Sequence, residues 1–585
     1  MSDASTHRAV KYLLSYLKKH LISITGGLLV LIAVDSLQLI IPRIIQQILD
    51  ELGKSNFSIS IIYKGTILIF ASAALMVFLR FLWRLLIVFP SRIMEKQIRE
   101  DMYSHLQNLS CSYFDNIKTG DLMALFINDL NSIRMATGMA LVGMADALFL
   151  SIMSLLFMVS ISPRLTLITV LPLPLIIFLF IKSGKLIQIR HTRVQEAFDK
   201  ISSHTQESFS GVRIVKSFVQ EKNEQNIFRD LCDNYVGKNI SLVKVWGLLF
   251  PAITFLASLS LSLLYYFGGR DVITERISVG QFVSFTFYIN LLVWPMIASG
   301  WVFSMFQRGI ASAKRILRML DSKPDISIPQ NSSPLRSLRG EIEFRSLSFR
   351  YNPESPDVLK SISLRIPAGS SLGIIGKPGS GKTTLVSLLF NLYPVGEGEI
   401  FIDGIDINKI PLTLLRSSIG YVPQDPFLFS DTVRENIAFG SARTVSDEKI
   451  FESAMKASIH DEILSFTDGY SARIGERGIS LSGGQRQRLS IARAIIAERP
   501  VIVFDDAMSA VDAATEKQIK RNMEKVLSGR TSIIIAHRIS TVKDCNRIIV
   551  LDSGSISESG SHEELLQRDG FYSRLYELQK MKGSL

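Results

Sequence analysis

Hydrophobic residues form long runs in the first 320 positions of the chain and short, interrupted runs after that. Six of the long runs approach the roughly 20 residues that a helix needs to cross a bilayer. They are Leu21–Ile41, Ile61–Val88, Met139–Ser160, Leu165–Ile181, Leu248–Phe267 and Val279–Phe303. From Gly340 onward, short apolar strands alternate with glycine turns and amphipathic helices. The pattern therefore predicts an α-helical membrane domain with six transmembrane helices, followed by an α/β domain.

The stretch Asp321–Gly340 separates these two regions and is rich in Pro, Ser and Asn, which is typical of a linker. We therefore expect a transmembrane domain over residues 1–320, a linker over 321–340 and the α/β domain over 341–585. At the N-terminus, Val10, Leu13 and Leu17 recur at helical spacing with lysines between them. This spacing predicts an amphipathic helix on the membrane surface, and an ordinary helical extension is the alternative.

Lysine and arginine are unevenly distributed among the segments that connect the spans. The N-terminus, the second-to-third connection, the fourth-to-fifth connection and the segment after the sixth span are basic, whereas the other connections are short or poor in positive charge. Basic connections lie on the cytoplasmic side of a membrane. We therefore expect a multi-pass protein of the cell membrane whose C-terminal domain is cytoplasmic. The two basic connections are long and amphipathic, so the helices should continue well beyond the bilayer.

Four charged residues interrupt the apolar runs: Asp35, Arg80, Arg84 and Asp146. A central Asp or Arg costs about 2.5–3.5 kcal/mol on insertion scales, which a dozen aliphatic residues can offset. Such residues face a bundle interior or a wet cavity rather than lipid. Whether they contact a transported molecule or pair with each other stays open at this point.

Cysteine content and net charge narrow the class of protein. The three cysteines are far apart and form no CxxC pattern, which excludes a disulfide framework or a structural zinc site. The formal net charge is +12, but the basic residues are spread along the chain. This distribution favours a membrane surface or a nucleotide as the anionic partner, and not nucleic acid.

A glycine-rich turn gives the strongest chemical signal. It follows the apolar stretch Leu372–Ile375, precedes an apolar helix and fits the pattern G-x-x-x-x-G-K-[ST]. Its residues, with the one that follows, are Gly376, Lys377, Pro378, Gly379, Ser380, Gly381, Lys382, Thr383 and Thr384. In such a loop backbone N–H groups surround phosphate oxygens, the lysine neutralises the β- and γ-phosphates, and the hydroxyl after it binds Mg²⁺. The turn predicts a site for ATP and Mg²⁺.

Two more segments fit this chemistry. The stretch Val501–Asp505 reads as a buried strand that ends in a carboxylate, and Asp505 can supply the oxygen ligand that Mg²⁺ prefers. The segment Leu481-Ser482-Gly483-Gly484-Gln485 reads as a serine N-cap with glycines that open a helix, which makes a second phosphate-binding helix end. The two helix ends need not serve the same nucleotide.

The LSGGQ segment closely resembles the signature of the ATP-binding cassette (ABC) family. The chain is also similar to that family at Tyr351, at Gln424 in YVPQDPFLF, at residues 509–512 and at His537 in IIIAHR. The segments Tyr113–Arg134 and Gln206–Glu221 resemble the family's cytoplasmic coupling segments. Six spans ahead of one cassette resemble half-size exporters, including bacterial multidrug and lipid A exporters.

This resemblance implies an ATPase that drives export as one half of a dimer. Tyr351 would then stack on adenine, and Thr383, Gln424 and Asp505 would serve Mg²⁺. His537 would contact the γ-phosphate. Residues Ser482, Gly483, Gly484 and Gln485 would cap the nucleotide bound by the opposite subunit.

One residue departs from the family pattern. After the strand carboxylate, active members usually carry the glutamate that activates water, and here the residue is Asp506. Aspartate is one methylene shorter, or about 1.5 Å, and a general base must reach its proton within about 2.6–3.2 Å. A displacement of about 1 Å can cost about 100-fold in rate. We therefore expect ATP binding to survive and hydrolysis at this chain's own P-loop to be slow.

A weakened base beside an intact LSGGQ resembles one half of an asymmetric heterodimeric exporter. We therefore expect a partner half that carries glutamate at this position. The alternatives are a homodimer active at both sites, a mainly regulatory ATP-binding subunit, and an ATP-gated sensor or channel without cargo. The aromatic-rich spans permit amphipathic drugs, lipids or peptides as cargo, in contact with membrane lipids.

Overall fold

The computed structural model describes residues 2–54, 58–326, 337–441, 444–475, 481–508 and 513–581. The chain divides into two compact units. The first comprises Met1–Gln107 and Thr119–Ser322, and the second comprises Asn108–Lys118 and Lys323–Leu585. The domain bounds that we expect at residues 320 and 341 stay a prediction, because residues 327–336 of the expected linker lie outside the described part.

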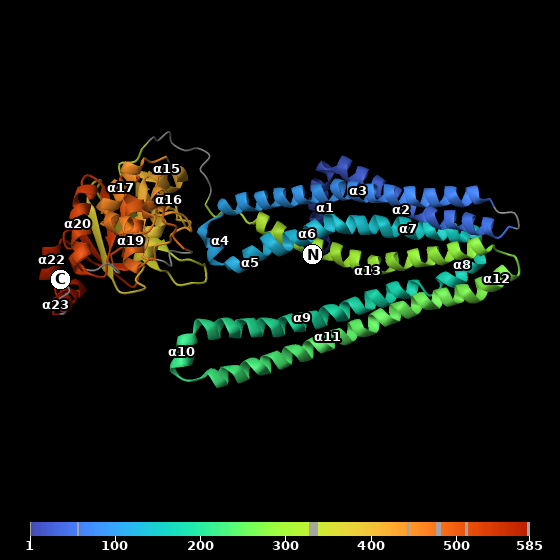
Figure 1. Cartoon of the computed structure of the whole chain (residues 1–585). Coiled ribbons are helices and arrows are strands. Elements are labelled where there is room, and N and C mark those ends of the chain that lie inside the picture. Colours follow the sequence, from blue (N-terminus) through green and yellow to red (C-terminus); the bar gives the residue numbers. More distant parts are fainter. Residues whose placement is uncertain are drawn as a thin grey trace. The chain divides into compact units, whose positions relative to one another are not determined.

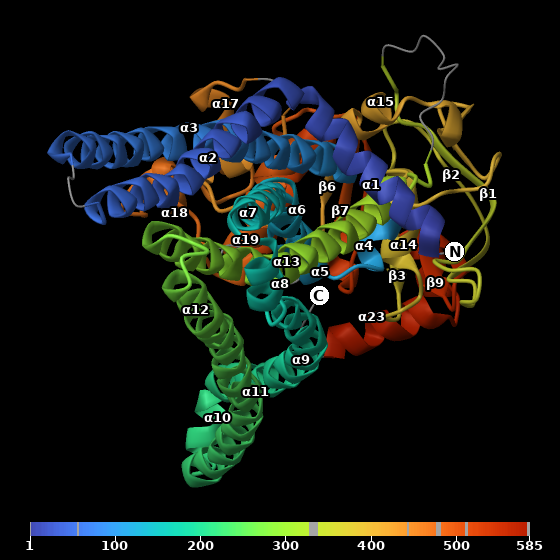
Figure 2. The same cartoon turned by 90° about the vertical axis from the view of Figure 1, so that its right-hand side faces the viewer.

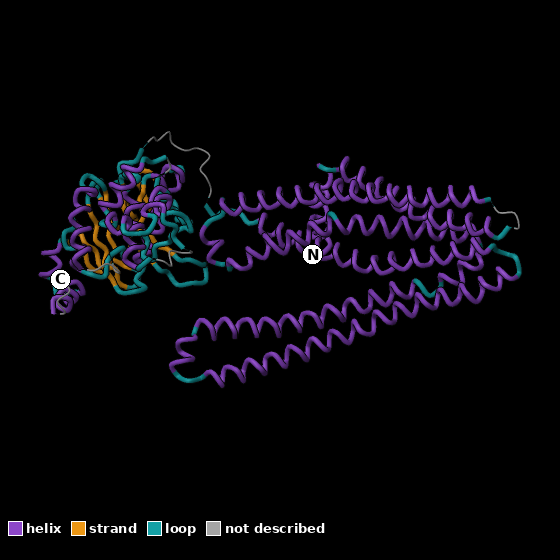
Figure 3. The backbone as a smooth tube through the Cα atoms, viewed as in Figure 1, coloured by secondary structure: helices purple, strands orange, loops and turns teal. Residues whose placement is uncertain are grey.

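The described residues of the first unit contain helices and no strand (Figures 1 and 3). Six of its helical stretches are long and apolar enough to cross a membrane, which confirms the predicted six-span architecture. They are Leu21–Leu52, Ile59–Gln107, Thr119–Ile161, Pro163–Ser210, Glu221–Ile273 and Val279–Asp321. At 1.5 Å per residue, the 49 residues of Ile59–Gln107 measure about 73 Å against a bilayer core of about 30 Å. The helices therefore extend beyond the membrane, as their amphipathic ends predict.

The helices of this unit follow one another with short connections. Their bounds are α1 Ser2–Lys19, α2 Leu21–Leu52, α3 Ile59–Gln107, α5 Thr119–Ala124, α6 Leu130–Thr137, α7 Met139–Ile161, α8 Pro163–Val170, α9 Pro174–Ser210, α10 Val212–Ser217, α11 Glu221–Leu263, α12 Gly269–Ile273 and α13 Val279–Asp321, with π-helical turns at Leu125–Asp129 and Leu264–Gly268. Figures 1 and 2 show α9 and α11 side by side as a long hairpin with α10 at its end. Large apolar side chains point outward along α3, as a lipid-facing helix requires; Phe70 is 76% exposed.

The N-terminal helix α1 packs on α13. Ala9, Leu13 and Tyr16 of α1 are buried, and Arg8 donates a hydrogen bond of 2.7 Å to Asp321. Leu14, which follows Leu13 in the sequence, is 47% exposed. The helix is thus confirmed as amphipathic, and its place on the membrane surface stays a prediction.

Two of the charged residues within the spans lie close to each other. Asp35 of α2 is buried near Asp146 of α7, and its Oδ2 atom has no hydrogen-bond partner among the described residues. Arg80 of α3 is exposed and lies close enough to act on both carboxyls electrostatically. The charged residues thus lie together, and contact with cargo stays open.

The second unit contains two sheets. One is antiparallel with strand order β2-β1-β4-β5. The other has the order β10-β9-β3-β8-β7-β6 and is parallel except for β10. The bounds are β1 Ile342–Phe349, β2 Leu359–Ile366, β3 Ser371–Gly376, β4 Ile400–Ile402, β5 Ile405–Asp406, β6 Ile419–Val422, β7 Val501–Asp505, β8 Thr531–Ile535, β9 Arg547–Asp552 and β10 Ser555–Gly560.

Buried aliphatic side chains fill the space between the sheets and on the far face of the parallel sheet. The helices of this unit are α4 Cys111–Asp115, α14 Lys382–Leu389, α15 Leu412–Ser417, α16 Val433–Ala438, α17 Asp447–Lys456, α18 His460–Leu464, α19 Gly483–Ile495, α20 Ala513–Leu527, α21 Ile539–Val542, α22 His562–Gln567 and α23 Phe571–Met581. The neighbours β3, β8, β7 and β6 run parallel, so their carboxyl ends meet at one edge of the sheet. Ligands of open α/β sheets bind at that edge.

The short helix α4 lies between α3 and α5 in the sequence but belongs to the second unit. Tyr393 donates a 2.8 Å hydrogen bond from its hydroxyl to the Asp115 carboxylate. The Ser110 hydroxyl accepts a 2.9 Å hydrogen bond from the backbone N–H of Asp325. The first residues of the segment that resembles a coupling segment, up to Lys118, thus belong to the second unit, where Asp115 accepts a side-chain hydrogen bond.

Candidate nucleotide-binding site

The glycine-rich turn joins β3 to α14. Gly381 is the N-cap of α14 and has φ +97°, in the left-handed region that favours glycine. A Cβ atom on Gly376 would lie 2.3 Å from the carbonyl oxygen of Leu551. The backbone can follow this path only with glycine at both positions, and the turn thereby brings its N–H groups to the start of α14.

Lys382 lies in the first turn of α14 and folds back over the loop. Its Nζ donates 2.9 Å hydrogen bonds to the carbonyl oxygens of Gly376 and Lys377. Burial lowers the pKa of the Lys382 ammonium, while Asp505 and Asp506 act in the opposite direction. The Lys382 ammonium therefore lies close to two carboxylates.

Asp505 ends β7 next to the turn and is buried. Its carboxylate accepts a 3.2 Å hydrogen bond from the Thr383 hydroxyl and a 3.4 Å hydrogen bond from the Tyr421 hydroxyl. Burial raises the pKa of Asp505, and these two hydrogen bonds lower it. The hydroxyl of Thr383 and the carboxylate of Asp505 form an adjacent pair of hard oxygen donors, the kind that Mg²⁺ prefers.

A cavity of about 300 Å³ brings the separate motifs together. Its walls are Val358, Pro378 to Thr384, Gln424, Asp505, Asp506, Ile535 and His537. Tyr351 lies beside it: its hydroxyl is 2.9 Å from the hydroxyl of Thr384, and its ring is 43% exposed. Residues 378–384, Gln424, Asp505 and His537, which we expect to bind nucleotide and Mg²⁺, thus meet in one place within the second unit, whereas Gly376 and Lys377 do not line the cavity.

The LSGGQ segment lies outside this cavity, at the start of α19. The Ser482 hydroxyl accepts a 3.2 Å hydrogen bond from the N–H of Gln485, and the Gln485 side chain accepts a 2.9 Å hydrogen bond from the N–H of Ser482. The predicted serine N-cap is therefore confirmed as a capping box. None of Ser482, Gly483, Gly484 and Gln485 lines the P-loop cavity. The related segment at residues 509–512 lies outside the described residues.

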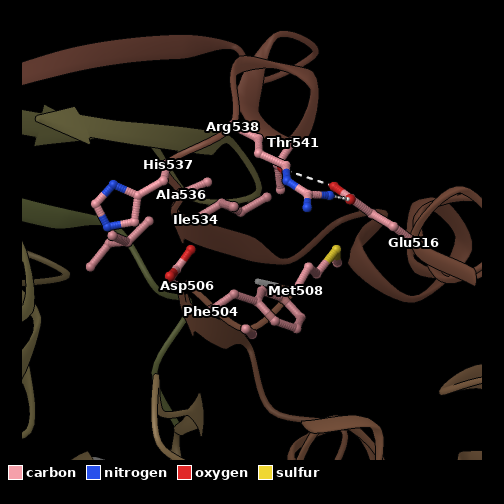
Figure 4. A pocket seen from close by; sticks show the side chains of 11 residues that line it. Phe504, Asp506, Met508, Glu516, Ile534, Ala536, His537, Arg538 and Thr541 are labelled. Carbon is pink, nitrogen blue, oxygen red and sulfur yellow. Dashed lines mark hydrogen bonds and ion pairs between the residues drawn. The ribbon is translucent and has the colours of Figure 1, made fainter. Parts of the chain in front are cut away.

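Asp506 has an unusual backbone conformation. Its φ is +46°, which is uncommon for a residue other than glycine, and its N–H donates a 2.9 Å hydrogen bond to Ile535. Asp506 and His537 also line a second cavity of about 70 Å³, shown in Figure 4. Strand β7 directly before Asp506 and the hydrogen bond to Ile535 of β8 fix the backbone at this carboxylate.

Glu516 of α20 also lines that second cavity, and no sequence motif marks it. The Glu516 carboxylate accepts hydrogen bonds of 2.7 Å from Arg538 and 2.9 Å from Thr541 (Figure 4). Glu516 is 8% exposed although its helix is polar. The hydrogen bond to Arg538 braces the loop that carries His537. The one signal in the sequence is the arginine directly after His537.

Replacing Glu516 with glutamine should destabilise this unit by about 1–2 kcal/mol, because two hydrogen bonds lose their charged acceptor and Arg538 loses its ion pair. Calorimetry of the full chain should show an apparent Tm lower by about 2–6 °C. Glu524→Gln on the same helix is the matched control, since Glu524 is exposed and should shift the Tm by less than about 1 °C. Equal shifts in the two variants would contradict a bracing role for Glu516.

Comparison with known proteins places this site in a family. The model of the ABC transporter transmembrane region matches residues 24–296, and the ABC transporter model matches residues 359–509. The chain is 34% identical to the probable multidrug resistance ABC transporter ATP-binding/permease protein YheI of Bacillus subtilis, over 97% of each chain. It is 37% identical to an ATP-dependent lipid A-core flippase of Syntrophus aciditrophicus, over 82% of this chain and 80% of the relative.

A solved structure shares the whole architecture. A bacterial Atm1-family ABC exporter with ATP bound superposes with a TM-score of 0.81 at 27% identity and covers 96% of this chain and 99% of its own. The P-loop cavity, the six spans and the related proteins all indicate the same family. The chain therefore belongs to the ABC transporter family, as a multi-pass ATPase of the cell membrane whose nucleotide-binding domain is coupled to transport.

Proposed function

We propose that this chain is one half of a dimeric exporter that uses ATP to move amphipathic small molecules, drugs or lipids across the cell membrane. The observation that carries the proposal is the cavity of the second unit, where the P-loop meets Gln424, Asp505, Asp506 and His537. The relatives named as multidrug and lipid A-core transporters support the class of cargo. The bounds 1–320, 321–340 and 341–585 for membrane domain, linker and cassette are part of the proposal.

Within the cavity, we assign roles by chemistry and position. The N–H groups of the P-loop and the Lys382 ammonium bind the phosphates, and Tyr351 stacks on the adenine. Mg²⁺, when bound, neutralises phosphate charge, and Thr383, Asp505 and Gln424 supply its oxygen ligands. His537 donates a hydrogen bond to the γ-phosphate, and Asp506 orients the attacking water.

The position of the signature supports a dimer. The residues Ser482–Gln485 lie outside the cavity that holds the P-loop of the same chain, so they are available to cap the nucleotide of a partner. The tip of the α9–α11 hairpin also exposes apolar side chains: Phe209 is 73% and Phe218 is 71% exposed. These residues belong to the cytoplasmic extension and not to a span, so lipid does not cover them. A partner subunit would bury them.

The shorter carboxylate at Asp506 favours a heterodimer with one slow site. If this is right, the isolated chain should hydrolyse ATP slowly, and addition of a partner half with glutamate at this position should raise turnover. In that pair, removal of the partner's glutamate should abolish turnover, and Asp506→Ala in this chain should change it less than about 3-fold. Steady-state ATPase assays of the chain alone and of the pair measure both effects.

Fast turnover by the isolated chain, with a large loss on Asp506→Ala, would instead support the homodimer with two active sites. Transport is measured separately, as ATP-dependent uptake into inside-out vesicles of a fluorescent amphiphile added to the medium. A pair that hydrolyses ATP and moves no amphiphile, drug or lipid would contradict export and favour the regulatory or sensor alternatives.

A further inference from the structure

The helix α23, near the C-terminal end of the chain, contacts the loop that carries His537. This loop joins β8 to α21, and its residues 536–538 lie in neither a helix nor a strand. His537 is exposed, and no hydrogen bond among the described residues holds its imidazole ring. The direction in which the ring points therefore depends on the backbone that carries it (Figure 4).

The side chain of Gln579 in α23 makes two hydrogen bonds to the backbone of this loop region. Its amide nitrogen donates a 2.8 Å hydrogen bond to the carbonyl oxygen of His537. Its amide oxygen accepts a 2.9 Å hydrogen bond from the N–H of Ile539, the first residue of α21. An amide offers both a donor and an acceptor, whereas a carboxylate offers only acceptors. Gln579 therefore satisfies both backbone groups at once.

The hydrogen bond from Ile539 satisfies a buried group. The first N–H groups of a helix have no partner within that helix, and the N-cap residue of α21, Arg538, makes no side-chain cap. Ile539 is buried, so water does not replace the missing acceptor. A buried N–H without an acceptor is unfavourable, and the fold therefore favours the position in which the Gln579 amide contacts the loop.

Packing and helix capping anchor α23 before it reaches Gln579. Tyr572 is buried in one apolar cluster with Ala536 and Ile539. At the start of the helix, the carboxylate of Glu558 in β10 accepts hydrogen bonds from two backbone N–H groups of α23. The helix therefore presents the Gln579 amide to the loop from a fixed position.

Gln579 does not line the P-loop cavity, whereas His537 does. We propose that Gln579 is a positioning residue: its two hydrogen bonds keep the imidazole of His537 directed into the cavity, where the γ-phosphate of ATP binds. The role of Gln579 rests on the role proposed above for His537. Because ADP lacks the γ-phosphate, Gln579 should affect the binding of ATP and not that of ADP.

Fluorescence titration of the full chain with labelled ADP and with a labelled, non-hydrolysable ATP analogue tests this role. Gln579→Leu keeps the size of the side chain and removes both hydrogen bonds. It should weaken binding of the ATP analogue about 3- to 10-fold and leave ADP binding within about 2-fold. His537→Ala should weaken binding of the analogue about 10-fold, and Gln579→Leu added to it should cause no further loss, because both variants remove the same contact.

Two further variants separate a positioning role from a structural one. Gln579→Glu keeps an acceptor for the N–H of Ile539 but loses the donor to the carbonyl oxygen of His537, so it should lose the preference for the ATP analogue over ADP as Gln579→Leu does. Glu577→Leu is the matched control: Glu577 is exposed on the same helix, about 200° around its axis from Gln579, and its loss should change neither affinity.

The measured affinities distinguish the possible failures. The positioning role is overturned if Gln579→Leu weakens ADP and the ATP analogue equally, if Gln579→Glu keeps the wild-type preference, or if the losses of Gln579→Leu and His537→Ala add in the double variant. A loss of preference in His537→Ala without one in Gln579→Leu refutes the positioning role alone. If His537→Ala itself keeps the preference, the proposed contact of His537 with the γ-phosphate is wrong, and the positioning role falls with it.

Discussion

Replacing Lys382 with alanine is expected to weaken ATP binding at this chain's P-loop by about 100-fold or more, because a charged donor to phosphate is lost in a partly buried site. Among the described residues, Lys382 is the only lysine or arginine that lines the P-loop cavity. Asp505 and Asp506 line the same cavity, so its remaining charge would repel a triphosphate. Fluorescence titration of the full chain with a labelled ATP analogue, with and without Mg²⁺, measures the change.

Lys377→Ala in the same loop is the control for this experiment. Lys377 does not line the cavity, and its ammonium lies 5.9 Å from the ring of Phe571. Its removal should change the dissociation constant by less than about 5-fold, since an exposed charge interacts weakly. If Lys382→Ala binds the analogue as tightly as Lys377→Ala does, the phosphates are not held by this turn.

Local sequence patterns predicted the elements of the fold well. The six apolar runs became six spans, and Val501–Asp505 is β7 with the predicted bounds. A continuous apolar stretch that ends in a carboxylate is enough to predict such a strand. A strand that is buried on both faces does not need to alternate polar and apolar residues. The order of the strands could not be predicted, since it depends on pairings such as that of β3 with β8, more than 150 residues away in the sequence. The assignment of α4 to the second unit depends equally on distant contacts, such as that of Asp115 with Tyr393.

In the candidate site, too, local motifs could be predicted from the sequence and residues that depend on distant contacts could not. Motifs with fixed spacing predicted the P-loop and Asp505, and the resemblance to the ABC family added Gln424 and His537. Residues 378–384 of the P-loop line one cavity together with Asp505, Gln424 and His537, and their chemical roles stay predictions. Glu516 and Tyr421 were missed because each is a single residue with no spacing pattern. Glu516 is recognised only when the fold brings it to Arg538, and Tyr421 only when its hydroxyl reaches Asp505.

Lengthening Asp506 to glutamate should raise the rate of ATP hydrolysis at this chain's own P-loop by about 10- to 100-fold. The backbone at this position is fixed by its hydrogen bond to Ile535 and by β7 directly before it. The added methylene therefore extends the carboxylate by about 1.5 Å toward the cavity and is not absorbed by the main chain. ATP affinity should stay within about 3-fold, because Lys382 and Thr383 are unchanged.

Single-turnover hydrolysis of radiolabelled ATP by the full chain, with saturating Mg²⁺, isolates this site from a faster partner site. Asp506→Asn is the matched control: it keeps the length of aspartate, removes the base and should slow hydrolysis further or leave it at the same low rate. The ratio of the hydrolysis rates of these two variants separates a slow site from a competent one. If Asp506→Glu gives no gain while Asp506→Asn gives a large loss, then aspartate already positions the water through this backbone, and the chain needs no partner with a better base.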